Sequence, residues 1–144
     1  MHEAALAIRL QIHVLNASTS GEIDAAFATL VRERADALFV AGDAFFGSRR
    51  VQIVTLAARD RIPAAYPGRD NVAAGGLMSY GTDLGETLRQ VGVYTGNILK
   101  GVKPADLPVL QSTKFEFVIN LQTAKLLGIE VPETLLATAD EVIQ

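Results

Sequence analysis

Residues 37–46 read ALFVAGDAFF. The first five, Ala37–Ala41, form a short continuous apolar run, which is typical of a parallel strand whose two faces are both buried. Gly42 and Asp43 interrupt this run, and helical spacing of apolar residues follows over about residues 48–61. A buried strand, a turn and a helix form the repeating unit of an α/β protein, so this stretch predicts that fold class.

The same alternation continues along the chain. Alternating apolar and polar residues predict a strand over Ile8–Leu15. Thr19 and Glu22 have capping-box spacing, so a helix is expected from there to about Arg34. The other expected elements are strands at 63–66, 77–81, 115–120 and 141–143, a loop at 67–71, a long helix over 83–99, and short helices at 121–127 and after Pro132. Repeated strand–helix units imply a three-layer α-β-α sandwich with a mainly parallel sheet, of the flavodoxin-like or Rossmann-like kind.

The composition limits the classes of function. The chain has 144 residues, 49% of them hydrophobic and 20% charged, which is a globular composition with enough length for one core. Its formal net charge is −3 and no basic cluster exceeds Arg49–Arg50, so a nucleic-acid partner is not expected. The absence of cysteine excludes disulfides, thiol catalysis and cysteine-ligated zinc. No apolar run is long enough to predict a membrane span or a signal peptide.

Motifs for catalysis and cofactors are missing as well. Neither His2 nor His13 has a partner at metal-ligand spacing, so no metal site is expected. No nucleophile motif of the G-x-S-x-G type occurs. Gly42 and Gly47 have the spacing of a phosphate-binding loop, but Ser48-Arg49 stands where that loop needs Lys-Ser or Lys-Thr. The sequence therefore predicts a protein that is not an enzyme and that has no cofactor.

Polar and aromatic residues follow the predicted strands. Asp43 comes directly after the apolar run, at the sheet edge where open α/β sheets bind ligands, although capping of the next helix explains an aspartate there equally well. Phe45 and Phe46 follow Asp43 closely. Either one of the two rings faces a cleft, or both rings are buried in the core on different sides. The predicted ligand-binding residues are Asn16, Ser18, Asp43, Phe45, Phe46 and Tyr66. They include no base–nucleophile pair, which favours a binding surface. The pair Arg49–Arg50 is interpreted as a solvated helix face or as a contact to an anion or partner.

Several stretches, in order, resemble one family. They are ADALFV at 35–40, IVTLAAR at 53–59, IPAAY at 62–66, AGGLMSYG at 74–81, ILKGVKPADLP at 98–108, TKFEFVINLQTAK at 113–125 and LGI at 127–129. The most specific are GGLMSYG and KFEFVINLQTAK. Together they span essentially the whole chain and resemble the substrate-binding component of ABC transporters of the tryptophan/tyrosine or branched-chain amino-acid type.

This resemblance implies the type I periplasmic-binding-protein fold. Such proteins have two α/β lobes joined by three crossing segments, are about twice this length, begin with a secretion signal and trap ligand when the lobes close. The chain is then expected to be the C-terminal half. Residues 1–76 would form most of the second lobe, residues 79–111 would return to the first lobe, and residues 113–144 would cross back, with boundaries near Ser79–Asp83 and Gln111–Lys114.

The resemblance also implies a function. The chain would bind an amino-acid-like small molecule in a cleft between lobes and serve an ABC permease, in the periplasm or as a membrane-anchored extracellular protein, although the sequence as given carries no export signal. Asp43 would meet a ligand ammonium group, and the aromatic residues would stack on the ligand. Two alternatives are a stand-alone α/β module with a structural or regulatory role and no ligand of its own, and a small enzyme on a flavodoxin-like scaffold.

The helix expected over Asp83–Leu99 carries an apolar stripe that, in the family, would pack on the first lobe. Exposed apolar patches drive association, and exchange of a segment between protomers is a low-cost route to a dimer. We therefore expect this segment to fold back on its own chain or to pair with a second copy, as a homodimer.

Overall fold

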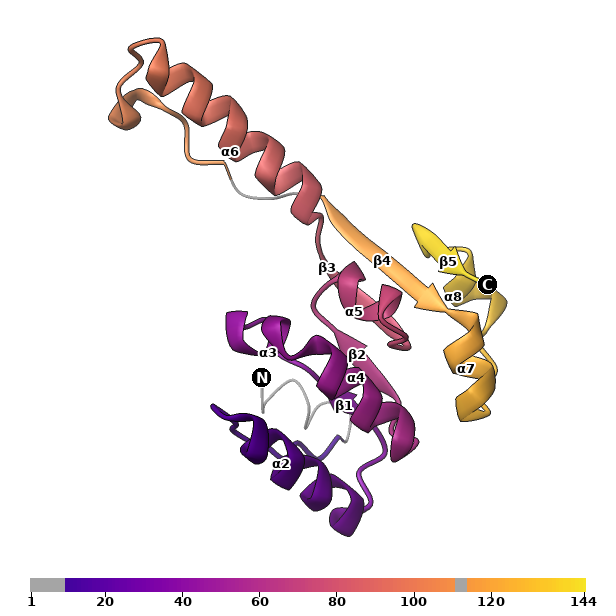
Figure 1. Cartoon of the computed structure of the whole chain (residues 1–144). Helices are drawn as coiled ribbons and strands as arrows, with labels where there is room; N and C mark the ends of the chain where they lie inside the picture. Colours follow the sequence, from indigo (N-terminus) through magenta and orange to yellow (C-terminus); the bar gives the residue numbers. More distant parts are fainter. Residues whose placement is uncertain (1–9, 111–113) are drawn as a thin grey trace. The chain divides into compact units, whose positions relative to one another are not determined.

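The computed structural model describes residues 10–110 and 114–144 (Figure 1). The chain divides into two compact units, Met1–Arg34 and Ala35–Gln144, called here the first and second units.

The first unit contains helix α2 (Ser20–Glu33). The predicted capping box is confirmed: Thr19 Oγ1 accepts a hydrogen bond from the Glu22 amide at 3.2 Å, and the Glu22 carboxylate accepts one from the Thr19 amide at 3.2 Å. The helix ends at Arg34, which takes a left-handed conformation.

The strand predicted over Ile8–Leu15 is wrong for the part of it that the structure describes. Residues 10–17 have no regular secondary structure, and residues 8 and 9 lie outside the described residues. Leu10 and Val14, which the alternation assigned to a buried face, are exposed. A strand is stable only when a neighbouring strand pairs with its backbone N–H and C=O groups, and the alternation of side chains gives no information about such a partner.

The second unit contains a five-stranded sheet in the order β1-β2-β3-β4-β5 (Figure 1). Its strands are β1 (Leu38–Phe39), β2 (Ala64–Tyr66), β3 (Met78–Thr82), β4 (Phe115–Asn120) and β5 (Glu141–Ile143). All neighbours are parallel except β3 and β4, which are antiparallel. The predicted mainly parallel α/β sheet is confirmed.

Helices flank both faces of this sheet. They are α3 (Ala44–Ser48), α4 (Arg50–Arg59), α5 (Arg69–Ala73), α7 (Leu121–Leu127) and α8 (Glu133–Leu136). Val72 of α5 is fully buried on one face, where its carbonyl accepts from the Asn120 amide group. On the other face, Leu135 of α8 lines a hollow together with Met78 and Ile119, which are paired across β3 and β4. The sheet therefore lies between two layers of helices, with α5 on one face and α8 on the other.

The loop predicted at residues 67–71 is shorter than expected, because α5 begins at Arg69. Gly68 has an extended conformation at the N-cap, and Asp70 supplies a negative charge in the first turn, where the helix dipole favours it. Burial of Val72 then holds this short helix against the sheet. The connection between β2 and α5 is therefore only Pro67–Gly68.

Helix α6 (Leu84–Leu99) follows β3, and a short 3₁₀ turn (Pro104–Asp106) lies in the segment that returns toward β4. Asp83 caps α6 by accepting from the Glu86 amide at 3.0 Å, as the predicted start of the helix requires. None of the residues of α6 is buried. The assignment of 79–111 and 113–144 to segments that cross between lobes stays a prediction, and residues 111–113 lie outside the described part.

Candidate ligand-binding site

The carboxyl ends of β1, β2 and β3 lie at one edge of the sheet, because these three strands are parallel. The amino end of β4 lies at the same edge, because β4 runs antiparallel to β3. Asp43, the Pro67–Gly68 connection, Asp83 and Lys114 therefore follow or precede strands at this edge. Loops at this edge of an open α/β sheet are where ligands bind.

Asp43 is the N-cap residue of α3. Its Oδ1 accepts a hydrogen bond from the Phe45 amide at 2.7 Å, so the capping role considered in the sequence is observed. Its Oδ2 has no partner among the described residues, and the residue is exposed. One carboxylate oxygen thus fixes the turn while the other remains accessible to a second donor.

Two aromatic rings and a cation come from the same turn. The rings of Phe45 and Phe46 are 5.8 Å apart between centroids and tilted by 51°, and both residues are half-buried. The Arg49 guanidinium lies 5.9 Å from the Phe45 ring centroid, within cation–π range. In the described part of the chain, Arg49 has no ion pair. The segment Asp43–Arg49 therefore presents a carboxylate, two apolar rings and a guanidinium within seven residues.

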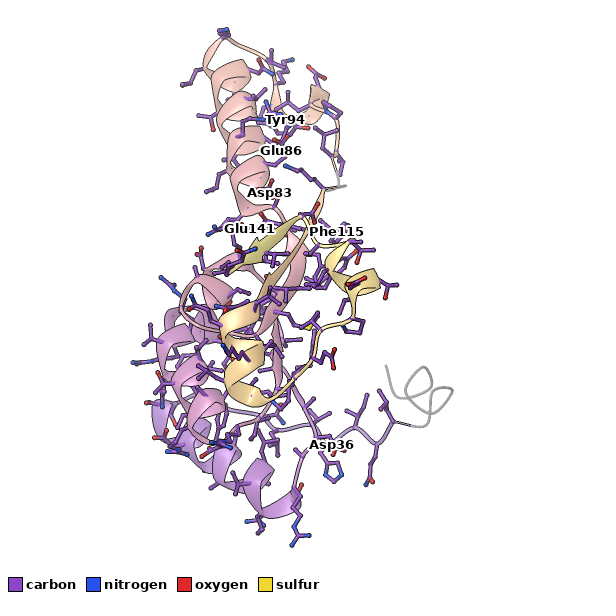
Figure 2. The ribbon with its side chains drawn as sticks, turned by 90° about the vertical axis from the view of Figure 1, so that its right-hand side faces the viewer. Asp36, Asp83, Glu86, Tyr94, Phe115 and Glu141 are labelled. Atoms are coloured by element: carbon purple, nitrogen blue, oxygen red, sulfur yellow. The ribbon has the colours of Figure 1, made fainter. Side chains whose placement is uncertain are left out.

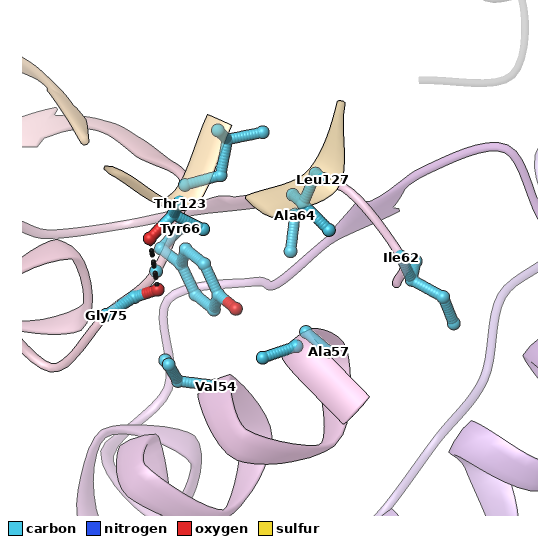
Figure 3. A pocket seen from close by; sticks show the side chains of 11 residues that line it. Val54, Ala57, Ile62, Ala64, Tyr66, Gly75, Thr123 and Leu127 are labelled. Carbon is cyan, nitrogen blue, oxygen red and sulfur yellow. Dashed lines mark hydrogen bonds between the residues drawn. The ribbon is translucent and has the colours of Figure 1, made fainter. Parts of the chain in front are cut away.

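The structure places Tyr66 in the core and not on the predicted rim. Only 1% of it is exposed, and its ring lines a small pocket together with residues such as Val54, Ala57 and Gly75 (Figure 3). Burial raises the pKa of its hydroxyl to about 12. Tyr66 is the last residue of β2, and strand residues alternate between faces, so its position at the strand end did not show that its side chain turns inward.

Asn16 and Ser18 belong to the first unit, where both are exposed. The Ser18 amide and Oγ donate to the Glu22 carboxylate at 2.6 and 2.8 Å. The Ser18 amide is the largest cause of the lowered pKa of Glu22. Ser18 thus stabilises the start of α2 in this structure.

Sequence reasoning missed an ion pair in the second unit. Arg69 Nε and Nη2 donate to the two Glu141 carboxylate oxygens at 2.7 and 2.6 Å. These bonds lower the pKa of Glu141 and raise that of Arg69. The partners are 72 residues apart in sequence, so spacing gave no sign of the pair.

An aromatic cluster on β3 and β4 was also missed. Tyr80 stacks on Phe115 at a centroid distance of 5.6 Å and meets Phe117 edge-on at 6.3 Å. Both Tyr80 and Phe115 are exposed. The alternation Phe115-Glu116-Phe117, opposite a strand that contains Tyr80, was the available signal, because alternate residues share a face.

Metal sites and membrane-spanning helices were also considered. Within residues 10–110 and 114–144, no three His, Asp or Glu side chains gather in a way that could hold a metal ion. None of the helices described there combines the length and apolar character that a membrane crossing needs.

A family model described as "ABC transporter substrate binding protein" matches residues 1–143. The chain belongs to the ABC transporter substrate-binding protein family. The predicted resemblance is confirmed, and this family is of a substrate-binding, non-enzymatic kind.

Individual relatives agree with this assignment. A tyrosine-binding protein of Clostridioides difficile is 26% identical over 130 residues, which is 90% of this chain and 37% of that protein. A crystal structure of an ABC domain in complex with L-Trp, from Streptococcus pneumonia, is 28% identical with a TM-score of 0.87, covering 98% of this chain and 49% of that one. A conserved domain protein from Vibrio cholerae is 25% identical with a TM-score of 0.87, covering 98% and 47%. The chain thus spans half or less of the length of these matched proteins.

Proposed function

We propose that this chain is the C-terminal, ligand-binding portion of the solute-binding component of an ABC importer and that its ligand is an amino-acid-like small molecule. The observation that carries the proposal is the turn Asp43–Arg49, which offers opposite charges beside two rings at the ligand-binding edge of the sheet. Membership of the family and the ligands named for two relatives, tyrosine and L-Trp, support it.

Each group in this turn matches a part of an amino acid. The unoccupied Asp43 Oδ2 can accept from a ligand ammonium group, and a charge-assisted hydrogen bond of this kind is stronger than a neutral one. The Arg49 guanidinium can donate two parallel bonds to a ligand carboxylate. Phe45 and Phe46, tilted by 51°, offer ring faces and edges to an aromatic or apolar side chain.

The role in transport follows as part of the same proposal. A binding component of this family would deliver its ligand to an ABC permease, which places it in the periplasm or at the outer surface of the membrane. Binding, and not catalysis, is the activity we assign. Asn16 and Ser18 remain proposed ligand contacts from the first unit.

The test is a titration by isothermal calorimetry of the purified chain with L-tryptophan, L-tyrosine, L-leucine and glycine. Asp43→Asn is the informative variant, because asparagine caps a helix about as well as aspartate but lacks the charge. We expect it to weaken binding by about 10- to 100-fold. Asp36→Asn is the matched control, because Asp36 is also exposed but precedes β1 and so lies at the opposite end of that strand (Figure 2).

Equal loss of affinity in both variants would show that Asp43 has no specific role. Absence of heat with every ligand would favour the second reading, a stand-alone α/β module with a structural or regulatory role.

A further inference from the structure

Helix α6 is joined to the sheet by two short chain segments. A single residue, Asp83, lies between Thr82, the last residue of β3, and the start of the helix (Figure 2). On the return, Lys114 directly precedes β4. The returning segment is bonded to the helix itself, because the Tyr94 hydroxyl donates to the Pro108 carbonyl. None of the residues of α6 is buried, so packing contributes little to the direction of the helix relative to the sheet.

All the polar groups of Asp83 are hydrogen-bonded. Its amide donates to the Lys114 carbonyl at 3.1 Å, which continues the pairing of β3 with β4 by one residue. Its carbonyl accepts from the amide and the hydroxyl of Thr87 at 3.1 and 3.0 Å. In its carboxylate, Oδ1 accepts from the Glu86 amide at 3.0 Å, and Oδ2 accepts from Lys114 Nζ at 2.8 Å. One residue is thus bonded both to the first turn of α6 and to the segment that enters β4.

The ion pair between Asp83 and Lys114 is specific and partly shielded from solvent. The Asp83 side chain is only 23% exposed, and partly buried pairs are screened less by salt than exposed ones. Glu86 and Glu116 also raise the pKa of Lys114, but Asp83 is the largest cause, and Lys114 is the largest cause of the lowered pKa of Asp83. A Cβ atom added at Gly85 would lie 3.2 Å from Asp83 Oδ1, so the glycine leaves the carboxylate the space that it occupies.

We infer that the ion pair between Asp83 and Lys114 fixes the direction of α6 relative to the sheet. While the pair is formed, the carboxylate ties the first turn of α6 to the segment that enters β4. When the pair is removed, Oδ1 still caps the helix, so α6 stays helical but changes direction about the single residue that joins it to β3. The neighbouring pair of Glu86 with Arg89 has no such effect, because both residues belong to α6. This inference rests on the contacts of Asp83 and does not depend on the proposed ligand.

The first test measures the direction of α6 with two spin labels, which can be attached selectively because the chain has no cysteine. Leu99→Cys at the end of α6 and Leu126→Cys in α7 carry the labels, since both positions are exposed. Double electron–electron resonance gives the distribution of the distance between them. We expect a narrow distribution in the labelled parent chain and a broader one in Lys114→Gln and in Asp83→Asn, whose asparagine still caps the helix. Lys114→Arg keeps the charge and should restore the narrow distribution.

Arg89→Gln is the matched control, because it removes an ion pair within α6 and leaves both bonds between Asp83 and Lys114 in place. Its distance distribution should stay narrow, and helix content by circular dichroism should be equal in all variants.

The second test is hydrogen exchange at the Asp83 amide, followed by NMR. This amide should exchange up to about fivefold faster in Lys114→Gln, which is the upper range for an exposed ion pair, and at an unchanged rate in Arg89→Gln. A broad distance distribution in the labelled parent chain would overturn the inference. Equally narrow distributions in Lys114→Gln and Arg89→Gln, or a loss of helix content in Lys114→Gln, would overturn it as well.

Discussion

Gly81 of β3 lies directly against the backbone of the Pro67–Gly68 connection. A Cβ atom built on Gly81 would stand 1.9 Å from the Pro67 carbonyl oxygen and 2.9 Å from its carbon. Carbon–oxygen contacts are comfortable only from about 3.3 Å, so Gly81→Ala demands that one backbone move by about 1.4 Å. The atoms that would collide with this Cβ belong to the Pro67 backbone, so no flexible side chain can move aside. The β3 strand is also held in place, because it is paired with β2 on one side and with β4 on the other.

Overpacking of this kind costs about 1–3 kcal/mol, and more where the backbone cannot relax. At about 4 °C per kcal/mol for a chain of this size, the melting temperature of Gly81→Ala should fall by about 4–12 °C. The assay is thermal and urea unfolding followed by circular dichroism. Because Pro67 and Gly68 lie at the proposed ligand-binding edge, the same variant should also bind its ligand more weakly.

Gly47→Ala provides the control. Gly47 lies in α3, a Cβ atom there would meet nothing within 4 Å, and alanine is favoured over glycine in a helix by up to about 1 kcal/mol. Its melting temperature should therefore equal or exceed that of the original chain. If Gly81→Ala were as stable as Gly47→Ala, the close approach of β3 to Pro67 would not limit this fold, and the reasoning would fail.

Two further predictions concern single side chains. The pKa of Tyr66 is about 12 when folded and about 10 when unfolded, so the stability that its neutral hydroxyl supports is complete below pH 10 and is lost as pH rises through 12. The loss should approach about 3 kcal/mol, and Tyr66→Phe should remove it from urea-unfolding free energies measured between pH 9 and 12; identical pH profiles would contradict this. Thr19→Ala should destabilise α2 by about 1 kcal/mol, because the Glu22 amide loses its cap, and hydrogen exchange at that amide should become faster; unchanged exchange would show that the cap is dispensable.

Local signals were sufficient for most elements of this fold. Capping chemistry marked the start of α2, and Gly128, with φ of 74°, ends α7 where the sequence placed its stop. The apolar run Ala37–Ala41 did lead to a strand, Leu38–Phe39, but the expected burial of both its faces is wrong, because Phe39 is 68% exposed. These features depend on a few neighbouring residues, which is why a single sequence reveals them.

The candidate site was only partly predictable. Asp43, Phe45 and Phe46 lie in the turn where they were expected, because a strand end and a helix start are both local features. The inward direction of Tyr66 depends on α4 and α7, and the pairing of Arg69 with Glu141 depends on β5 lying next to β4. Such contacts between distant segments are set by tertiary packing, which spacing along the chain does not encode.

The exposed apolar residues at positions 10–15 and along α6 have the same explanation. In both segments the apolar pattern predicts which face is buried, but it does not say which other element packs against that face. Full burial of one large apolar side chain is worth about 1.5–3 kcal/mol, whereas a whole domain is stable by only about 5–15 kcal/mol. The large apolar residues along one side of α6 are all more than 40% exposed, so their further burial would contribute a substantial part of that total: Leu84, Leu88, Val91 and Ile98. An amphipathic helix with this pattern therefore gains free energy whenever another surface covers its apolar side, in the same way as the residues of the core.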